Sequence, residues 1–272
     1  MGIIISLPVS LLLFWLVLKP KKADPFPKGG LWRLLIAGAL STVVAAILSQ
    51  TFSLIIAAIR IGPANVAETI NRMRTDMAAA GDFLQSLSFN KKRSPLMTLL
   101  STMITAGLLE ELCKYYACRA AIRKKGMVRT WMDALICFTA VGLTFQILEN
   151  LVYGGSYGII VAILRNLAPG HFIFGVIMGW YYGKYLIAGE KTYRFQCILW
   201  PALIHTLYDT GLNLMPNYDA DAGTGQIYIA MGLLAFVGAF VMAVIIIVKL
   251  VRWHKDGKLD TPIPDASGEP AG

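Results

Sequence analysis

The sequence predicts an all-α fold: a polytopic membrane helix bundle with about seven transmembrane helices and one short re-entrant or interfacial segment. Three observations indicate this fold class. Of the 272 residues, 56% are hydrophobic. Only 15% are charged, whereas a soluble domain carries about 25%. The apolar residues also form long runs between short charged clusters, and about 20 helical residues cross the ~30 Å hydrocarbon layer of a bilayer.

The apolar runs place the expected helices in order along the chain. The first, 2–18, lacks a basic N-terminal region and a small-residue cleavage site, so we interpret it as a retained helix rather than a signal peptide. Residues 159–168 are too few to cross the membrane alone, and Pro169-Gly170 interrupts the chain after them, so they form the short segment. The remaining expected spans are 34–59, 96–121, 131–153, 171–187, 195–214 and 226–251.

These spans divide the chain into four expected regions. Residues 1–95 form an N-terminal two-helix region with a polar extracytoplasmic loop. Residues 96–215 form the core, which carries the polar motifs described below. Residues 216–252 contain the C-terminal transmembrane helix. Residues 253–272 are rich in Pro, Gly and Asp, and we expect a disordered cytoplasmic tail.

Lysine and arginine set the expected orientation, because cytoplasmic loops carry an excess of them. The connections after the first, third, fifth and seventh spans are basic, whereas 213–225 holds two Asp and no Lys or Arg. We therefore expect a multi-pass protein of the plasma membrane with its N-terminus outside and its C-terminus inside. The loop 60–95 departs from this rule, with six basic residues on the expected outer side. The net charge of +9 is then a property of the loops, and we expect the lipid bilayer, not nucleic acid, as a partner.

Ionisable residues lie inside several expected spans, where each costs about 2.5–3.5 kcal/mol on insertion scales. Residues four apart share one face of a helix. A packing ion pair or an interhelical hydrogen bond would explain each group alone, but intramembrane ionisable residues favour a functional site when four helices carry them. The groups are Glu110, Glu111 and Lys114; Glu149 and Asn150; His171; and His205 with Asp209. In the span 171–187, Gly175, Gly179 and Gly183 form a stripe that lets helices approach closely.

Two histidines and two or three carboxylates match the ligands of a catalytic Zn²⁺, with a remaining glutamate as general base on water. Alternatively, Glu and His activate water without a metal, and both versions give hydrolysis. The sequence contains no H-E-x-x-H and no G-x-S-x-G motif. Asp133 is expected near the cytoplasmic end of its span and Asp209 in the outer half of its span. This separation argues against an aspartyl pair. A non-enzymatic alternative is that the polar helices line a path for ion or solute transport or bind a partner helix, although no internal repeat typical of transporters is present.

Four motifs follow one another between residues 108 and 214, one on each polar helix. They are E-E-x-x-K (Glu110, Glu111, Lys114) with an Asp at the start of the next helix (Asp133); F-x-x-x-E-N-x-x-Y (Phe145, Glu149, Asn150, Tyr153); Arg, His and Gly (Arg165, His171, Gly179); and H-x-x-x-D (His205, Asp209). In these motifs the sequence resembles the PrsW family of intramembrane proteases, which is related to the CAAX-prenyl endopeptidase and bacteriocin-processing superfamily.

The resemblance implies an intramembrane protease, a membrane-embedded endopeptidase that cuts a single-span, membrane-tethered protein such as an anti-sigma factor in regulated proteolysis. The family is labelled metalloprotease, whereas related CAAX enzymes are argued to use a metal-free Glu/His pair. The expected catalytic residues are Glu110, Glu111, Glu149, His171 and His205. For a metal version we favour Glu149, His171 and His205 as ligands, which leaves the two adjacent glutamates free. The expected supporting residues are Lys114, Asn150 and Asp209.

We expect Glu110, Glu149, His171 and His205 to converge in one cavity between the midplane and the outer face of the membrane. This requires the span 96–121 to be long and tilted, because Glu110 lies deep within it. Lys114 should neutralise one of the two adjacent glutamates. Asp209 should hydrogen-bond His205 and fix its tautomer.

Overall fold

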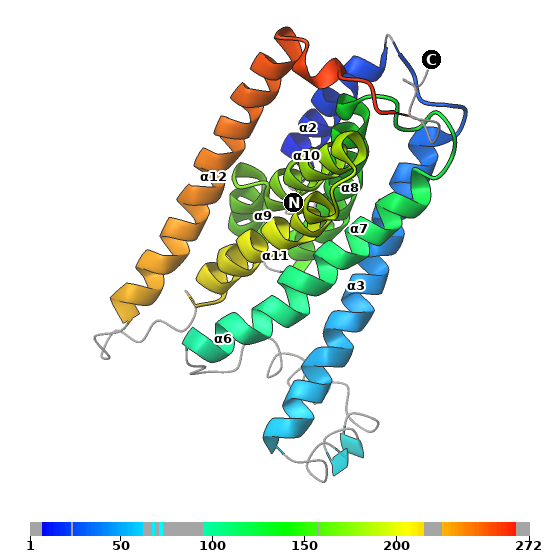
Figure 1. Cartoon of the computed structure of the whole chain (residues 1–272). Helices are drawn as coiled ribbons and strands as arrows, with labels where there is room; N and C mark the ends of the chain where they lie inside the picture. The colour runs from blue at the N-terminus through cyan, green and yellow to red at the C-terminus, as the bar shows by residue number, and fades with distance from the viewer. Residues whose placement is uncertain are drawn as a thin grey trace.

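The computed structural model of the chain describes residues 7–22, 24–61, 67–68, 71–72, 95–156, 158–214 and 225–264. Over these residues the chain is a bundle of helices (Figure 1). Two short 3₁₀ turns, η1 and η4, and one π-helical segment, η2, interrupt or extend them. In chain order the elements are α2 Pro8–Leu18, η1 Lys19–Lys22, α3 Gly30–Ile61, α6 Pro95–Thr102, η2 Met103–Leu108, α7 Leu109–Ala121, α8 Trp131–Ser156, α9 Gly158–Leu167, α10 Gly170–Ala188, α11 Lys191–Leu214, α12 Gly225–Lys255 and η4 Lys258–Asp260.

The predicted membrane helix bundle is confirmed. The described part of each expected span is helical, although residues 2–6 of the first span lie outside the described residues. The third span is formed by α6, η2 and α7, which run without a break from Pro95 to Ala121. The expected short segment is α9. Of the helices that the structure describes, four are long and apolar enough to cross a membrane, namely Gly30–Ile56, Pro95–Ala121, Trp131–Tyr153 and Gln226–Lys255.

Helix α8 lies at the centre of the bundle. Of its apolar stretch 72% is buried inside the protein, compared with 11% for α12, whose side chains face outward. Helices α2 and α3 of the N-terminal region and α10 of the core all pack against α8. Glu149 lies toward the end of this central helix, with its side chain 19% exposed.

The glycine stripe of α10 allows this helix to approach α8 closely, as predicted. A Cβ atom on Gly179 would lie 2.7 Å from the Cα of Leu135, which is closer than real Cβ contacts. Gly142 of α8 faces the first turn of α10, where a Cβ would lie 2.5 Å from the carbonyl oxygen of His171. Close packing of the two backbones therefore determines where His171 enters the bundle.

The connections that the sequence predicts as cytoplasmic gather at one end of the bundle, at the top of Figure 1. Lys21 Nζ lies 2.7 Å from Asp133 Oδ1, and Lys258 lies over the Trp180 ring. Asp133 also caps α8, because its Oδ2 accepts from the Thr130 amide at 3.2 Å while its own amide donates to the Thr130 hydroxyl. These contacts give Asp133 a structural role at the end of α8.

The C-terminal tail differs from the prediction of disorder after residue 252. Helix α12 continues to Lys255, and Leu259 and Ile263 beyond it are buried. The Trp131 amide donates to Thr261 at 3.0 Å, and the Ile263 amide donates to Arg129 at 2.8 Å. The two apolar side chains and this backbone pairing fasten the segment to the start of α8. Residues 265–272, and most of the loops 60–95 and 213–225, lie outside the described residues.

Candidate active site

Glu110 and Glu111 directly follow the π-helical segment η2 in the middle of the long helix. π-Helical turns are rare and occur frequently at functional sites. Gly107 in this segment packs against α11, where a Cβ would lie 2.1 Å from the Thr206 hydroxyl oxygen. The Glu111 side chain is fully buried, and that of Glu110 is 14% exposed. Both carboxylates are thus held inside the bundle beside α11.

His171, in the first turn of α10, has both ring nitrogens engaged. Nδ1 lies 2.8 Å from Lys114 Nζ, and Nε2 lies 2.5 Å from Glu149 Oε2. The ammonium group has only donors, so Nδ1 accepts a hydrogen bond and Nε2–H donates one to the carboxylate. His171 is therefore a neutral ring held between a cation and an anion.

His205, on α11, has carboxylates on both sides. Nδ1 lies 2.8 Å from Glu111 Oε1, and Nε2 lies 3.2 Å from Asp209 Oδ2 and 3.9 Å from Glu110 Oε2. Carboxylates accept hydrogen bonds only, so this setting favours the imidazolium form, in which both nitrogens donate. The predicted contact with Asp209 is present, but Glu111 makes the shorter one.

Lys114 joins the two histidines into one network. Its ammonium lies 2.7 Å from Glu111 Oε1, the atom that also binds His205, and 4.3 Å from the centre of the Phe145 ring. Glu110 Oε2 is more distant, at 3.7 Å. Lys114 was predicted to neutralise one of the adjacent glutamates, and its shorter ion pair is with Glu111. Glu110 Oε2 is buried and has no hydrogen-bond partner among the described residues.

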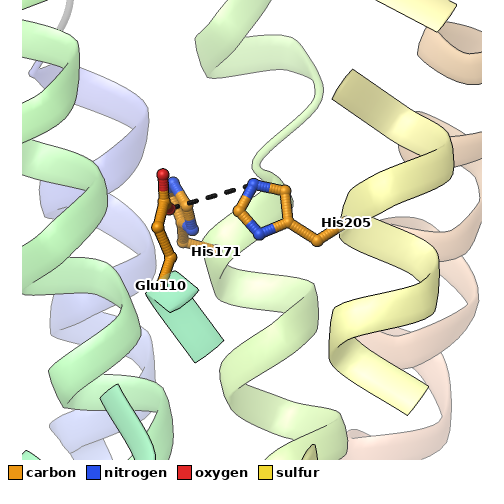
Figure 2. Close-up of side chains that lie close together, drawn as sticks. All are labelled: Glu110, His171 and His205. Atoms are coloured by element: carbon orange, nitrogen blue, oxygen red, sulfur yellow. Dashed lines mark ion pairs between the residues drawn. The ribbon is translucent and has the colours of Figure 1, made fainter. Parts of the chain in front are cut away.

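A small cavity lies beside the two histidines, but Glu110, which we expected to line it, is not among its lining residues. Glu110, His171 and His205 point toward one another from α7, α10 and α11 in Figure 2, and Glu149 lies against His171 from α8. The free space is about that of one water molecule. Its lining includes the predicted residues Glu149, Asn150, His171, His205 and Asp209, and also Gln146, Arg165, Phe174 and Tyr208.

Comparison with known proteins places this site in a family. A sequence model described as "PrsW family intramembrane metalloprotease" matches residues 27–248. The chain belongs to the PrsW family. It is 34% identical over 110 residues to the Protease PrsW of Geobacillus kaustophilus (strain HTA426), across 39% of this chain and 49% of the relative.

A second relative, the Protease PrsW of Bacillus subtilis (strain 168), is 29% identical over 122 residues, which cover 43% of this chain and 56% of the relative. The chain thus spans about half the length of the curated relatives that it matches. No solved structure matches the chain. Together with the four candidate spans, PrsW family membership identifies the chain as a multi-pass membrane protein.

The PrsW family is described as a metalloprotease family, and the site contains a donor set that fits a metal. One ligand atom each of Glu110, His171 and His205 lies within 4.8 Å of the others. Two His and one Glu are ligands of catalytic Zn²⁺ sites. Glu110 Oε2, which accepts no hydrogen bond from the described residues, suits this role. For His205 to bind through Nε2, that nitrogen would have to lose its proton and its 3.2 Å contact with Asp209, while Glu111 holds Nδ1.

This donor set differs from the predicted one in a single member, since Glu110 stands in place of Glu149. The Glu149 Oε2 atom already contacts both His171 and Arg165. For His171 to bind a metal through Nδ1, Lys114 would have to give up its 2.8 Å contact.

Two polar residues at the site were not assigned a role from the sequence. Arg165 was noted only as a motif residue, and its signal was a lone charge in the apolar segment 159–168. Gln146 precedes Glu149 by three residues and so shares its helix face. Its amide donates to the Ser10 hydroxyl at 2.8 Å and accepts from the Phe172 amide at 3.3 Å. Gln146 therefore ties α2 and the start of α10 to the wall of the cavity.

Proposed function

We propose that this PrsW-family protein is an endopeptidase that hydrolyses a peptide bond in a membrane-tethered protein. One observation carries the proposal: the buried Oε2 atom of Glu110 has no hydrogen-bond partner among the described residues and lies 3.9 Å from Nε2 of His205, which lines a cavity of about one water molecule. A buried carboxylate without a partner is costly, and a position beside water and a histidine is where a general base acts.

The reaction follows from the distances. Glu110 Oε2 and His205 Nε2 lie 3.9 Å apart, and one water molecule bridges such a gap. Glu110 takes a proton from this water as the water oxygen bonds to the substrate's carbonyl carbon. His205 Nε2–H donates to the carbonyl oxygen as negative charge develops there. When the C–N bond breaks, the proton on Glu110 passes to the leaving nitrogen.

The other residues hold these two groups in position. Glu111 fixes the His205 ring through Nδ1, and Lys114 balances the charge of Glu111. Asp209 accepts from Nε2 at 3.2 Å until substrate arrives. Glu149 lies against Nε2 of His171, where it keeps that ring directed at Lys114, and Asn150 accepts a hydrogen bond from Arg165 beside it.

A metal would be held by Glu110, His171 and His205. When bound, Zn²⁺ or a similar ion lowers the pKa of a bound water and polarises a carbonyl group. The donor set has its own test: purified protein should contain about one metal per chain, and both His171→Gln and His205→Gln should lower that content. Metal-free protein that still cleaves, with undiminished activity in chelator, would leave Glu110 in the role of general base.

We propose a single-span membrane protein as the substrate and, more specifically, an anti-sigma factor. The cavity lies late in α8 and at the start of α10, away from the end where the basic connections gather. With those connections in the cytoplasm, the N-terminus is outside, the C-terminus is inside the plasma membrane, and the cut falls on the extracytoplasmic side.

The convergence of the polar residues also supports hydrolysis over transport. A conduction path needs polar groups along the membrane normal, and a transporter site is generally built from broken helices of repeated units. Here ionisable residues of α8, α10 and α11 line one small cavity, and Glu110 Oε2 of α7 lies 3.9 Å from His205 Nε2 beside it.

The decisive experiment is co-expression with candidate single-span proteins tagged at both ends. We expect wild type to yield a discrete product and Glu110→Gln, which keeps the shape of the side chain, to lose it. Glu190→Gln is the matched control, since Glu190 is exposed in the connection between α10 and α11. An undiminished product from folded Glu110→Gln would show that Glu110 is not the base, and absence of any product from wild type across the candidates would contradict the proposed function.

A further inference from the structure

We propose that Arg165 is a positioning residue that acts from α9, through Glu149, on His171. The inference rests on the proposed hydrolytic function, because it concerns the same site. It adds a residue on a separate short helix to the groups that determine the geometry of the reaction.

Arg165 makes three contacts with one face of α8. Its Nη2 lies 2.5 Å from Glu149 Oε2, and its Nε donates to Asn150 Oδ1 at 3.0 Å. The guanidinium also lies 4.1 Å from the centre of the Tyr153 ring. The side chain is only 15% exposed. A planar guanidinium with several donors makes such contacts together, whereas an ammonium acts as one point charge.

The contact with Glu149 reaches the histidine directly. The oxygen that Arg165 holds, Oε2, is the same atom that lies 2.5 Å from His171 Nε2. Two donors on one oxygen restrict the carboxylate, and the carboxylate in turn directs His171 Nδ1 toward Lys114. Without Arg165, Glu149 has one fewer fixed contact and its charge is unbalanced on that side. We expect the His171 ring to lose its defined orientation.

Arg165 is also the polar tie between α9 and the rest of the site. Among the described elements, α9 packs chiefly against α8 and α2. Its side chains Ile163, Leu164 and Leu167 are 42–46% exposed, which suits contact with lipid. The position of α9 beside the cavity therefore depends on Arg165 as well as on apolar packing.

A double-mutant cycle tests the inference on purified protein with a cleaved substrate. We expect Arg165→Gln to lower kcat about 10–100-fold, as the loss of residues that orient active-site groups does, with KM changed less than about threefold. In a Glu149→Gln background the same change should have little further effect, because residues that act through one another are not additive. Arg165→Lys should recover part of the activity, and Arg123→Gln, an exposed arginine between α7 and α8, is the matched control.

Several results would overturn the inference. An equal loss from Arg165→Gln in wild type and in Glu149→Gln would show that Arg165 does not act through Glu149. A raised KM with unchanged kcat would place Arg165 on the substrate instead. If Arg165→Gln does not fold in detergent, Asn150→Ala removes one arginine contact and should lower kcat in the same non-additive way. Wild-type activity in Arg165→Gln, with Glu110→Gln inactive, would reject this inference alone, whereas an inactive wild type would reject the proposed function.

Discussion

His171 and His205 lie 5.2 Å apart between ring centres, yet their neighbours differ in charge. His171 lies between the Lys114 ammonium and the Glu149 carboxylate, and its ring is neutral. His205 lies between Glu111 and Asp209, and its setting favours the imidazolium. One residue type thus supplies a neutral hydrogen-bonding group and a charged donor in the same cavity. The comparison teaches that the partners of each ring nitrogen, rather than the residue type, determine the role of an intramembrane histidine.

Replacing each histidine in turn should give the largest losses of activity, and it tests whether the two rings have different roles. We expect His205→Gln to lower kcat about 10²–10⁴-fold, because it removes the charged donor at the reacting centre. His171→Gln should cost only about 10–100-fold, because this ring orients its neighbours. The measurement is cleavage of a single-span substrate in detergent, with folding checked by size-exclusion chromatography. Equal losses from the two variants would contradict the division of roles.

Changing the adjacent glutamates should separate activity from stability. Glu111 accepts from both Lys114 and His205, so Glu111→Leu leaves two buried polar groups without their partner and should cost about 3–5 kcal/mol of stability. Glu110→Leu removes the longer contacts of 3.7 Å with Lys114 and 3.9 Å with His205, so it should abolish cleavage with a much smaller loss of stability. Thermal unfolding of the two purified variants measures the difference. The same melting temperature for both would show that Glu111 does not anchor the network.

Truncating Asp209 should give the smallest loss of kcat, and it tests how much this second carboxylate contributes to holding His205. Because Glu111 still holds Nδ1, Asp209→Ala should lower kcat about tenfold, less than His205→Gln. Steady-state cleavage at saturating substrate is the measurement. Complete loss of activity from a folded Asp209→Ala protein would instead place Asp209 at the reacting centre.

Much of the helix bundle could be predicted because runs of about 20 apolar residues can be recognised in the amino-acid sequence. Pairs four apart, such as His205 and Asp209, also followed from helix geometry. The partner of each histidine nitrogen could not be predicted, because it depends on how each helix is rotated. The π-helical turn before Glu110 changes that rotation and has no pattern in the sequence. For this reason the predicted metal set contained Glu149, whereas the folded chain brings Glu110 to the two histidines.

Two further differences have similar causes. Arg165 meets Glu149 only because α9 folds back on α8, a tertiary arrangement that a lone arginine does not reveal. The tail after Trp253 resembles a disordered segment in composition, but two apolar residues, Leu259 and Ile263, suffice to hold it against the start of α8. Composition averages over a segment, whereas docking depends on a few side chains.

The small size of the cavity has a consequence for the shape of the substrate. A helix with its side chains is about 10–12 Å wide, and the cavity that His171 and His205 line is about the size of one water molecule. A transmembrane helix cannot enter such a space intact, and its carbonyl groups are already bonded within the helix. Under the proposed function, the bond that is cut is presented to this site as a single extended strand, from a stretch of the substrate that has left its helix or never formed one.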